Sequence, residues 1–129
     1  MRRNYPIVLS PQRDGAYLVT VPDLPTCVTS GSNIEEAFRM AEDALSACLI
    51  TLEDENFQLP EATAMENVLT KKGDLVLLLP VDTLEYRMST DTRAVRKNVS
   101  IPAWMATMVE RRSINCSQVL QDSLRHMLE

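Results

Sequence analysis

The chain of 129 residues has little of what metal sites and disulfide frameworks need. Histidine occurs once, at His126, and the three cysteines, Cys27, Cys48 and Cys116, are odd in number and form no CxxC pair. These counts argue against a disulfide framework and against a zinc site, and they suit a reducing cytoplasm. We therefore expect no metal and no cofactor.

Long apolar runs are also missing. The longest, LVLLLPV at residues 75–81, is far below the roughly 20 residues that a membrane-spanning helix needs. The opening MRRNYPIVL contains two arginines but no long apolar core and no small-residue cleavage site, so we expect no signal peptide. With 45% hydrophobic and 24% charged residues, the composition is typical of a soluble globular protein without a membrane partner.

What the sequence does contain is an uneven division of charge. Residues 1–92 hold 7 Lys and Arg against 15 Asp and Glu, a net of −8, whereas residues 93–129 hold 6 against 3, a net of +3. Such asymmetry favours two modules whose partners differ in charge. A chance difference between two solvated surfaces is the alternative.

The pattern in residues 1–86 predicts the order β-β-β-α-β. YPIVLS and YLVTVP flank a DG turn, which is a good hairpin signal, and CVTS gives a third short strand. A helix of about five turns follows. Ser32 or Asn33 can cap this helix, with Glu35 or Glu36 completing a capping box. GDLVLLLPV then predicts a buried fourth strand, so the expected class is α+β.

Residues 94–129 predict one strand followed by two helices, after a short hinge at residues 87–93. Pro102 stands where a first helical turn tolerates proline. Asn115 can cap the second helix, and Gln118 can complete a capping box there. So small a unit cannot bury enough surface alone, and its single strand has no neighbour in the same chain. We therefore expect it to pair with a second copy of itself.

Two antiparallel copies of the strand RKNVSI make a ribbon of the kind that fits the major groove of B-DNA. The outward face would then contact base edges through Arg96, Asn98 and Ser100. Amides at the start of the second helix, around Cys116 and Ser117, could hold a phosphate oxygen. The expected dimer core consists of Val99, Ile101, Met105, Met108, Val119 and Leu120. A plain dimerisation tail is the alternative, and the role of Trp104 stays open between packing, dimer contact and exposed flank.

Both halves of the chain resemble known families. NVSIPAWMATMVERRSINCSQVLQDSL resembles the ribbon-helix-helix DNA-binding domain, and YPIVLSPQRDGAYLVTVPDLPTCVTSGSNIEEAF resembles the HicB antitoxin family. The pieces that match the second family are the aromatic-Pro start, the DG-x-Y turn, PDLP, the Cys-Val-Thr strand and the EEA helix opening. Thr26 departs from that family, which often has glycine after PDLP.

The resemblance implies an antitoxin of a type II toxin-antitoxin pair. The first domain would have a partial RNase H-like fold and would bind and neutralise a HicA-type toxin, a small basic ribonuclease that cleaves mRNA. The C-terminal domain would bind operator double-stranded DNA and repress the shared operon. The implied assembly is a homodimer through the ribbon, with a tetramer left open. The alternative is a ligand-sensing ribbon-helix-helix transcriptional repressor whose front domain holds a small apolar ligand.

The acidic residues are poorly placed for catalysis. RNase H chemistry needs several carboxylates around two metal ions, the first of them on the opening strand, but residues 4–10 contain no acid. Asp14 lies in a turn and Asp23 in a loop, so we expect no catalytic residues and no enzyme activity.

An acidic surface suits a basic, phosphate-binding partner much better. On the predicted helix the candidates for such a contact are Glu35, Glu36, Glu42 and Asp43. An ordinary solvated helix face is the alternative reading of these four residues.

Overall fold

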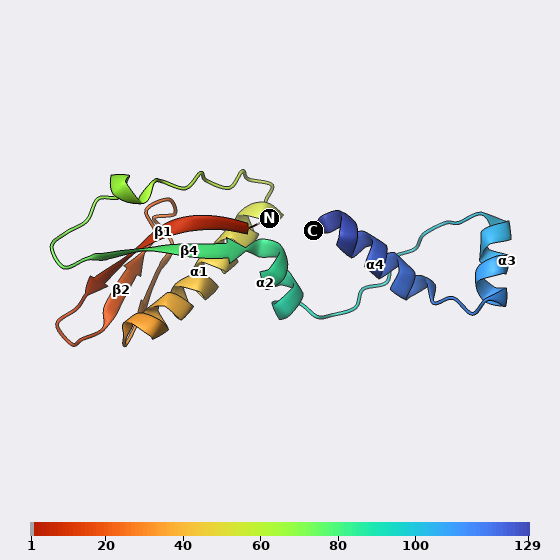
Figure 1. Ribbon diagram of the computed structural model, residues 1–129, viewed down its shortest axis with the longest axis horizontal. Coiled ribbons are helices and arrows are strands. Elements are labelled where there is room, and N and C mark those ends of the chain that lie inside the picture. The colour runs from red at the N-terminus through yellow and green to blue at the C-terminus, as the bar shows by residue number, and fades with distance from the viewer. Residues whose placement is uncertain (1) are drawn as a thin grey trace. The chain divides into compact units, whose positions relative to one another are not determined.

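The computed structural model describes residues 2–129, and the chain divides into two units, with the boundary between Thr90 and Asp91 (Figure 1). Across the described residues the chain has a four-stranded antiparallel sheet and four α-helices. The α+β class predicted from the sequence is therefore confirmed. The sheet and two of the helices belong to the first unit, and the other two helices belong to the second.

The sheet has the strand order β3-β2-β1-β4, and each strand is antiparallel to its neighbours. Its strands are β1 (Arg2–Pro11), β2 (Tyr17–Thr20), β3 (Val28–Gly31) and β4 (Leu75–Asp82). The hairpin between β1 and β2 turns at Gly15, whose φ of 86° is easily adopted by glycine. The four predicted strands are thus present in the predicted chain order.

Helix α1 (Ile34–Asp54) covers one face of the sheet (Figure 1). It begins as a capping box, because the Asn33 Oδ1 accepts from the Glu36 N–H at 2.8 Å while the Glu36 carboxylate accepts from the backbone N–H and hydroxyl of Ser32. Alternating strand residues and the apolar stripe of α1 form the core: Tyr5, Ile7, Leu9, Val19, Val21, Cys27, Ala37, Ala41, Leu45, Leu49, Leu79 and Val81.

A long segment, residues 55–74, carries the chain from the end of α1 to β4. Near its start, Asn56 has a φ of 61°, the left-handed conformation that Asn tolerates just after a helix end. Side chains then tie the segment to the first unit at two points. The Tyr5 hydroxyl donates to the Pro60 carbonyl at 2.6 Å, and Asp23 accepts from the N–H and the hydroxyl of Thr63. Within the segment lies a short 3₁₀ turn, η1 (Met65–Asn67).

Residues 87–90, the first part of the hinge expected at residues 87–93, are helical and belong to helix α2 (Thr83–Thr90) of the first unit. The Asp82 carboxylate caps this helix by accepting from the N–H groups of Leu84 and Glu85. Arg87 then binds Glu53 and Asp54 at the end of α1, with N···O distances of 3.2 and 2.8 Å. These contacts hold α2 on the first unit.

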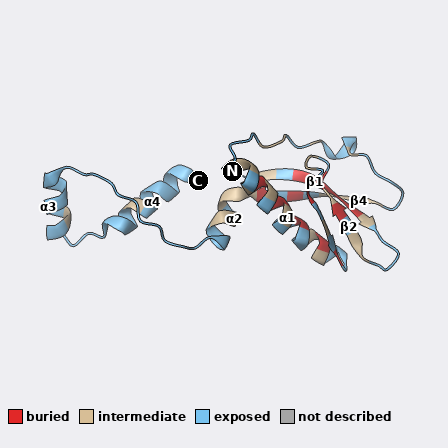
Figure 2. Ribbon diagram, turned by 180° about the vertical axis from the view of Figure 1, so that it is seen from behind, coloured by how far each residue is buried: buried red, intermediate tan, exposed pale blue. Residues whose placement is uncertain are grey.

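The second unit consists of α3 (Ala103–Arg111) and α4 (Cys116–Leu128), preceded by residues 91–102, which form neither helix nor strand. Between the helices, Ser113 has a φ of 51°, and the N–H of Ile114 donates to the Val109 carbonyl at 3.0 Å. This is a Schellman ending, which reverses the chain sharply after α3. Figure 2 shows that burial is confined to the first unit: none of residues 91–129 is buried.

The cap predicted for the second of these helices is confirmed in part. The Asn115 Oδ1 accepts from the Gln118 N–H at 3.1 Å, as expected of an N-cap. The reciprocal half of the predicted capping box is not formed, because the Gln118 side-chain amide donates forward to Asp122 at 2.9 Å instead. Pro102 is the N-cap residue of α3 rather than its first helical residue.

We predict that Gly31→Ala will destabilise the protein more than Gly15→Ala. A Cβ at Gly31 would overlap the backbone nitrogen of Ala37, so β3 and α1 would have to separate. At Gly15 a Cβ meets nothing within 4 Å, and the cost is the left-handed conformation alone, about 1 to 2 kcal/mol. Urea unfolding of the full chain, followed by circular dichroism, measures both losses. Equal losses would contradict the close packing of β3 on α1.

Candidate nucleic-acid interface

The residues predicted to contact DNA bases lie on an extended and fully exposed stretch of the second unit. Arg96, Asn98 and Ser100 are all exposed, and none of them takes part in a hydrogen bond described for residues 2–129. The apolar residues that alternate with them are exposed as well, Val99 to 64% and Ile101 to 45%. The strand predicted here is not formed in the single chain, because a strand needs a second strand to accept and donate its backbone hydrogen bonds.

The helices of the second unit leave their apolar faces uncovered in the same way. Of the predicted dimer core, Met105, Met108 and Val119 are exposed, and Leu120 is half-buried. Trp104 is exposed too. Leaving such side chains in water forgoes about 1.5 to 3 kcal/mol for each one that a folded core would bury. The second unit therefore has the elements of a core but does not enclose one by itself.

The start of α4 offers free backbone donors. Asn115 accepts from the Gln118 N–H through its side chain and from the Val119 N–H through its carbonyl. Among the hydrogen bonds of the described residues, none is donated by the backbone N–H of Cys116 or Ser117, and both residues are exposed. The positive end of the helix dipole lies at the same place. The geometry can accept one phosphate oxygen there.

The acidic residues predicted on the first helix are not equivalent. Glu35, Glu42 and Asp43 are exposed, whereas Glu36 is half-buried at the capping box. Hydrogen bonds from the Ser32 hydroxyl and backbone lower the pKa of Glu36, so this carboxylate serves the helix start. At the other end of α1, Glu53 and Asp54 are bound to Arg87. Of the four predicted carboxylates, those exposed to a partner are therefore Glu35 in the first turn of α1 and Glu42 and Asp43 further along the helix.

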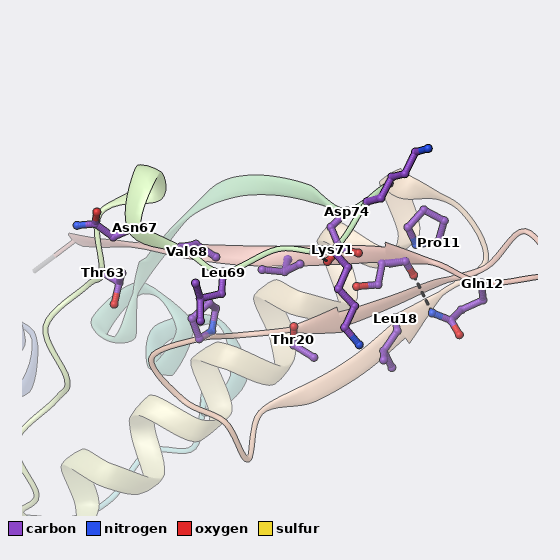
Figure 3. A pocket seen from close by; sticks show the side chains of 15 residues that line it. Pro11, Gln12, Leu18, Thr20, Thr63, Asn67, Val68, Leu69, Lys71 and Asp74 are labelled. Carbon is purple, nitrogen blue, oxygen red and sulfur yellow. Dashed lines mark hydrogen bonds between the residues drawn. The ribbon is translucent and has the colours of Figure 1, made fainter.

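A groove of about 920 Å³ lies on the sheet face opposite α1, between that face and the segment that precedes β4. In Figure 3 the Lys71 side chain extends towards β2, where Leu18 and Thr20 line the groove. Leu69, on its rim, is 95% exposed. Asp74 accepts from the Lys71 N–H at 2.9 Å, and this bond together with one from Ser10 lowers the pKa of Asp74. The sequence pattern did not single out this groove, because a segment without helical or strand periodicity forms one wall.

The thiols and carboxylates of the described residues do not gather into a metal site. Within residues 2–129, no group of three or more His, Cys, Asp or Glu side chains could hold a metal ion. Burial, and then the neighbouring thiol of Cys48, raise the pKa of Cys27 to about 12, so Cys27 stays a protonated thiol. Over the same residues, no helix has both the length and the apolar character needed to cross a membrane.

Comparison with known proteins places these features in a family context. Residues 5–122 match the family described as HicB_like antitoxin of bacterial toxin-antitoxin system. An uncharacterized 14.9 kDa protein from the rep-hol intergenic region of Haemophilus phage HP1 is 28% identical over 110 residues, which are 83% of this chain and 79% of the phage protein.

Two proteins named HicB are also similar to this chain. Antitoxin HicB 1 of Photorhabdus laumondii is 39% identical over 56 residues, which are 43% of this chain and only 36% of that antitoxin. The crystal structure of the Burkholderia pseudomallei antitoxin HicB superposes with a TM-score of 0.56 at 25% identity, covering 97% of this chain and 96% of that one. The family match extends from β1 into α4 and so spans both units. The chain therefore belongs to the HicB-like antitoxin family of bacterial toxin-antitoxin systems.

Proposed function

We propose that the first unit binds and neutralises a HicA-type, mRNA-cleaving toxin, and that the second unit binds the operator of the shared operon and represses it. The single observation that carries the proposal is the state of residues 91–129, where two capped amphipathic helices and an alternating segment bury none of their residues. Such a unit could bury its apolar side chains by pairing with a second copy of itself. In the proposal the two copies form a ribbon-helix-helix homodimer that acts in the cytoplasm.

The alternation in residues 96–101 supports an antiparallel ribbon. With a two-fold axis between two such strands, the side that carries Val99 and Ile101 faces the helices and covers their exposed apolar side chains. The opposite side presents Arg96, Asn98 and Ser100, whose donors and acceptors suit base edges in the major groove. Cys116 and Ser117, with their free backbone amides, would then hold phosphate oxygens on either side of the ribbon.

The first unit supports the other half of the proposal through its charge. Residues 1–92 carry a net charge of −8, and a ribonuclease that holds RNA phosphates needs a basic surface. Opposite charges speed the encounter and select the surface that meets the toxin. In this proposal the first unit, which ends with α2, is the toxin-binding domain with the partial RNase H-like fold that the family resemblance implied. No enzymatic activity is assigned to it.

A ligand-sensing repressor is the second hypothesis, and the groove opposite α1 is where a small apolar ligand would lie. The two hypotheses differ in a simple way. An antitoxin needs no small ligand for either of its tasks, so the purified chain should bind its operator and its toxin without any addition.

We predict that Arg96→Ala and Asn98→Ala will each weaken operator binding by about 1 to 3 kcal/mol per site, because each removes a contact that reads a base edge. Each variant should also relax the preference at one base position. Ser117→Ala should lower affinity evenly across operators, since a phosphate contact carries no sequence information. Arg125→Ala is the matched control, which removes a cation from the far end of α4. Fluorescence anisotropy against wild-type and base-substituted operators, at one salt concentration, measures these effects.

If Arg96→Ala and Asn98→Ala both bind the operator as tightly as the wild type while still forming dimers, the outward face of the strand does not lie in the groove. If Arg125→Ala loses as much operator affinity as Arg96→Ala, then Arg96 contributes only general electrostatic attraction to DNA and not a base contact.

We predict that residues 1–92 alone will inhibit the toxin's ribonuclease activity and will not bind operator DNA, because this segment contains the whole buried core. The control is the full chain carrying Arg96→Ala and Asn98→Ala, which should inhibit the toxin like the wild type. Cleavage of a defined RNA at increasing antitoxin concentration measures inhibition. An excess of residues 1–92 that leaves cleavage intact would overturn the division of labour, whereas weaker inhibition would show that dimerisation adds avidity.

A further inference from the structure

A small cleft opens in the first unit where α1, α2 and the end of β4 come together. Figure 1 shows α2 following directly on β4 and lying beside α1. The cleft has a volume of about 350 Å³ and shares no lining residue with the groove opposite α1. The residues that give it its chemical character are Arg2, Glu42, Ser46, Val81, Glu85 and Tyr86.

Ser46 lies at the bottom of this cleft without a hydrogen-bond partner. It is only 2% exposed, which is unusual for a serine. No hydrogen bond described for residues 2–129 involves its hydroxyl, and yet no fully enclosed side-chain oxygen of these residues lacks a partner. The hydroxyl is therefore open to the cleft that Ser46 lines. Because a buried hydroxyl without a partner costs free energy, it is a ready contact for a polar group that enters.

The charge around the cleft is mainly negative. Glu42 on α1 is exposed and takes part in no ion pair described for residues 2–129. Glu85 in the first turn of α2 lies 3.8 Å from the Arg2 Nη2, and both of these side chains are mostly exposed. Asp82 also lines the cleft, and its carboxylate accepts from the first N–H groups of α2. Three carboxylates and one guanidinium leave the lining with a net charge of −2.

This lining suits the side chain of an arginine. Val81 is buried and Tyr86 is half-buried, so both offer apolar surface to a methylene stem, and the ring of Tyr86 can also hold a cation against its face. The charged end would then lie between Glu42 and Glu85, within reach of the Ser46 hydroxyl. A guanidinium has five donors in a planar fork, and it can use several acceptors at once where an ammonium acts as a point charge. Among the described residues the acids do not gather into a metal site.

We propose that this cleft receives an arginine side chain of the basic toxin, with Glu42 and Glu85 pairing with its guanidinium and Ser46 hydrogen-bonded to it. The inference rests on the proposed function, in which the acidic first unit binds a basic ribonuclease. It distinguishes between the three exposed carboxylates predicted on α1, because Glu42 lines the cleft whereas Glu35 and Asp43 do not. A guanidinium held here is not available to an RNA phosphate, so the contact would contribute to neutralisation.

The first arm of the test measures how tightly the full chain binds the toxin, through inhibition of cleavage of a defined RNA. Glu42→Lys removes an acceptor and adds a repelling cation, and it should weaken inhibition by about tenfold or more. Asp43→Lys is the matched control, because it makes the same change of charge at the next residue of α1, which is also exposed but lies outside the cleft. It should weaken inhibition by less than about threefold, as expected of an exposed charge that has no specific partner.

Ser46→Ala tests the cleft without any change of charge. It removes only the hydroxyl from a helical position, and it should weaken inhibition several-fold because the guanidinium loses a hydrogen bond. Circular dichroism of each variant shows whether its secondary structure is kept. Wild-type inhibition by Ser46→Ala would exclude the hydroxyl from the contact.

The second arm needs no toxin. Acetyl-arginine amide, at millimolar concentrations, is added to the isotope-labelled full chain, and the backbone amide resonances of Ser46 and Tyr86 are followed by NMR. They should shift until the site is saturated. Acetyl-citrulline amide has a neutral urea in place of the guanidinium and should leave both resonances unshifted at the same ionic strength. In Glu42→Lys the arginine probe should no longer shift them.

The two arms separate the failure of the cleft from the failure of the proposed function. If the wild type inhibits the toxin while Glu42→Lys and Asp43→Lys lose equally, the proposed function stands and the cleft is not the contact. If the arginine probe shifts Ser46 and Tyr86 but the wild type does not inhibit the toxin, the cleft binds a guanidinium and the toxin is the wrong partner. Resonances that ignore the arginine probe, or that respond equally to citrulline, would overturn the guanidinium site.

Discussion

The second unit has an extended segment with no strand to pair with and two helices whose apolar faces are exposed, and the proposed function depends on this lack of partners. Apolar side chains left in water forgo the free energy of burial, and in residues 91–129 such side chains stand beside a segment whose backbone has no neighbouring strand to pair with. The unit has good local structure, since Asn115 caps α4 and a Schellman ending closes α3. It lacks a second apolar surface against which its helices could pack. A symmetric copy of itself supplies the missing strand and the missing half of the core at once.

The first unit differs, because it buries its apolar core within a single chain. Its sheet is covered by α1 on one face and partly by the segment before β4 on the other, and its core residues are closed off from water. The acidic residues that remain exposed on α1 are free to meet a basic partner, while Glu36 and the Glu53–Asp54 pair hold the ends of the helix in place. The first unit is acidic and has its own buried core, which suits binding of a basic toxin in the proposed function. The second unit is basic and lacks a core of its own, which suits a dimer that binds operator DNA.

The sequence predicts the regular parts of the fold well, because they rest on local signals. The four strands, the long helix with its Asn33–Glu36 capping box, and the Asn115 cap all follow from residue spacing. Helix α2 was missed, although Asp82 and Glu85 stand at capping-box spacing in DTLE and Asp82 does cap the helix. Its last turn is held by Arg87 on the end of α1, a contact between residues more than thirty positions apart that spacing does not reveal.

Other features lie beyond any reading of local pattern. The break between α3 and α4 was predicted, but Ser113 takes the left-handed conformation that glycine or asparagine usually supplies, so the residue type does not predict the form of the turn. The groove opposite α1 depends on where an irregular segment is tied down by Tyr5 and Asp23. The candidate DNA contacts are a different case. The alternation of polar and apolar residues is visible in the sequence. All of these side chains are exposed in the single chain, and the two sides of the segment would differ in burial only when a second chain is present.

Trp104, the only tryptophan of the chain, allows the central claim to be measured in the intact protein, since it lies on α3 in the second unit. Its fluorescence should report unfolding of that unit alone. If the second unit folds only by pairing, the midpoint of its thermal transition must rise with protein concentration, by mass action, across a series from about 1 to about 100 µM. A transition whose midpoint stays constant over that range would mean that residues 91–129 fold as a monomer, and the account given for this unit would be wrong.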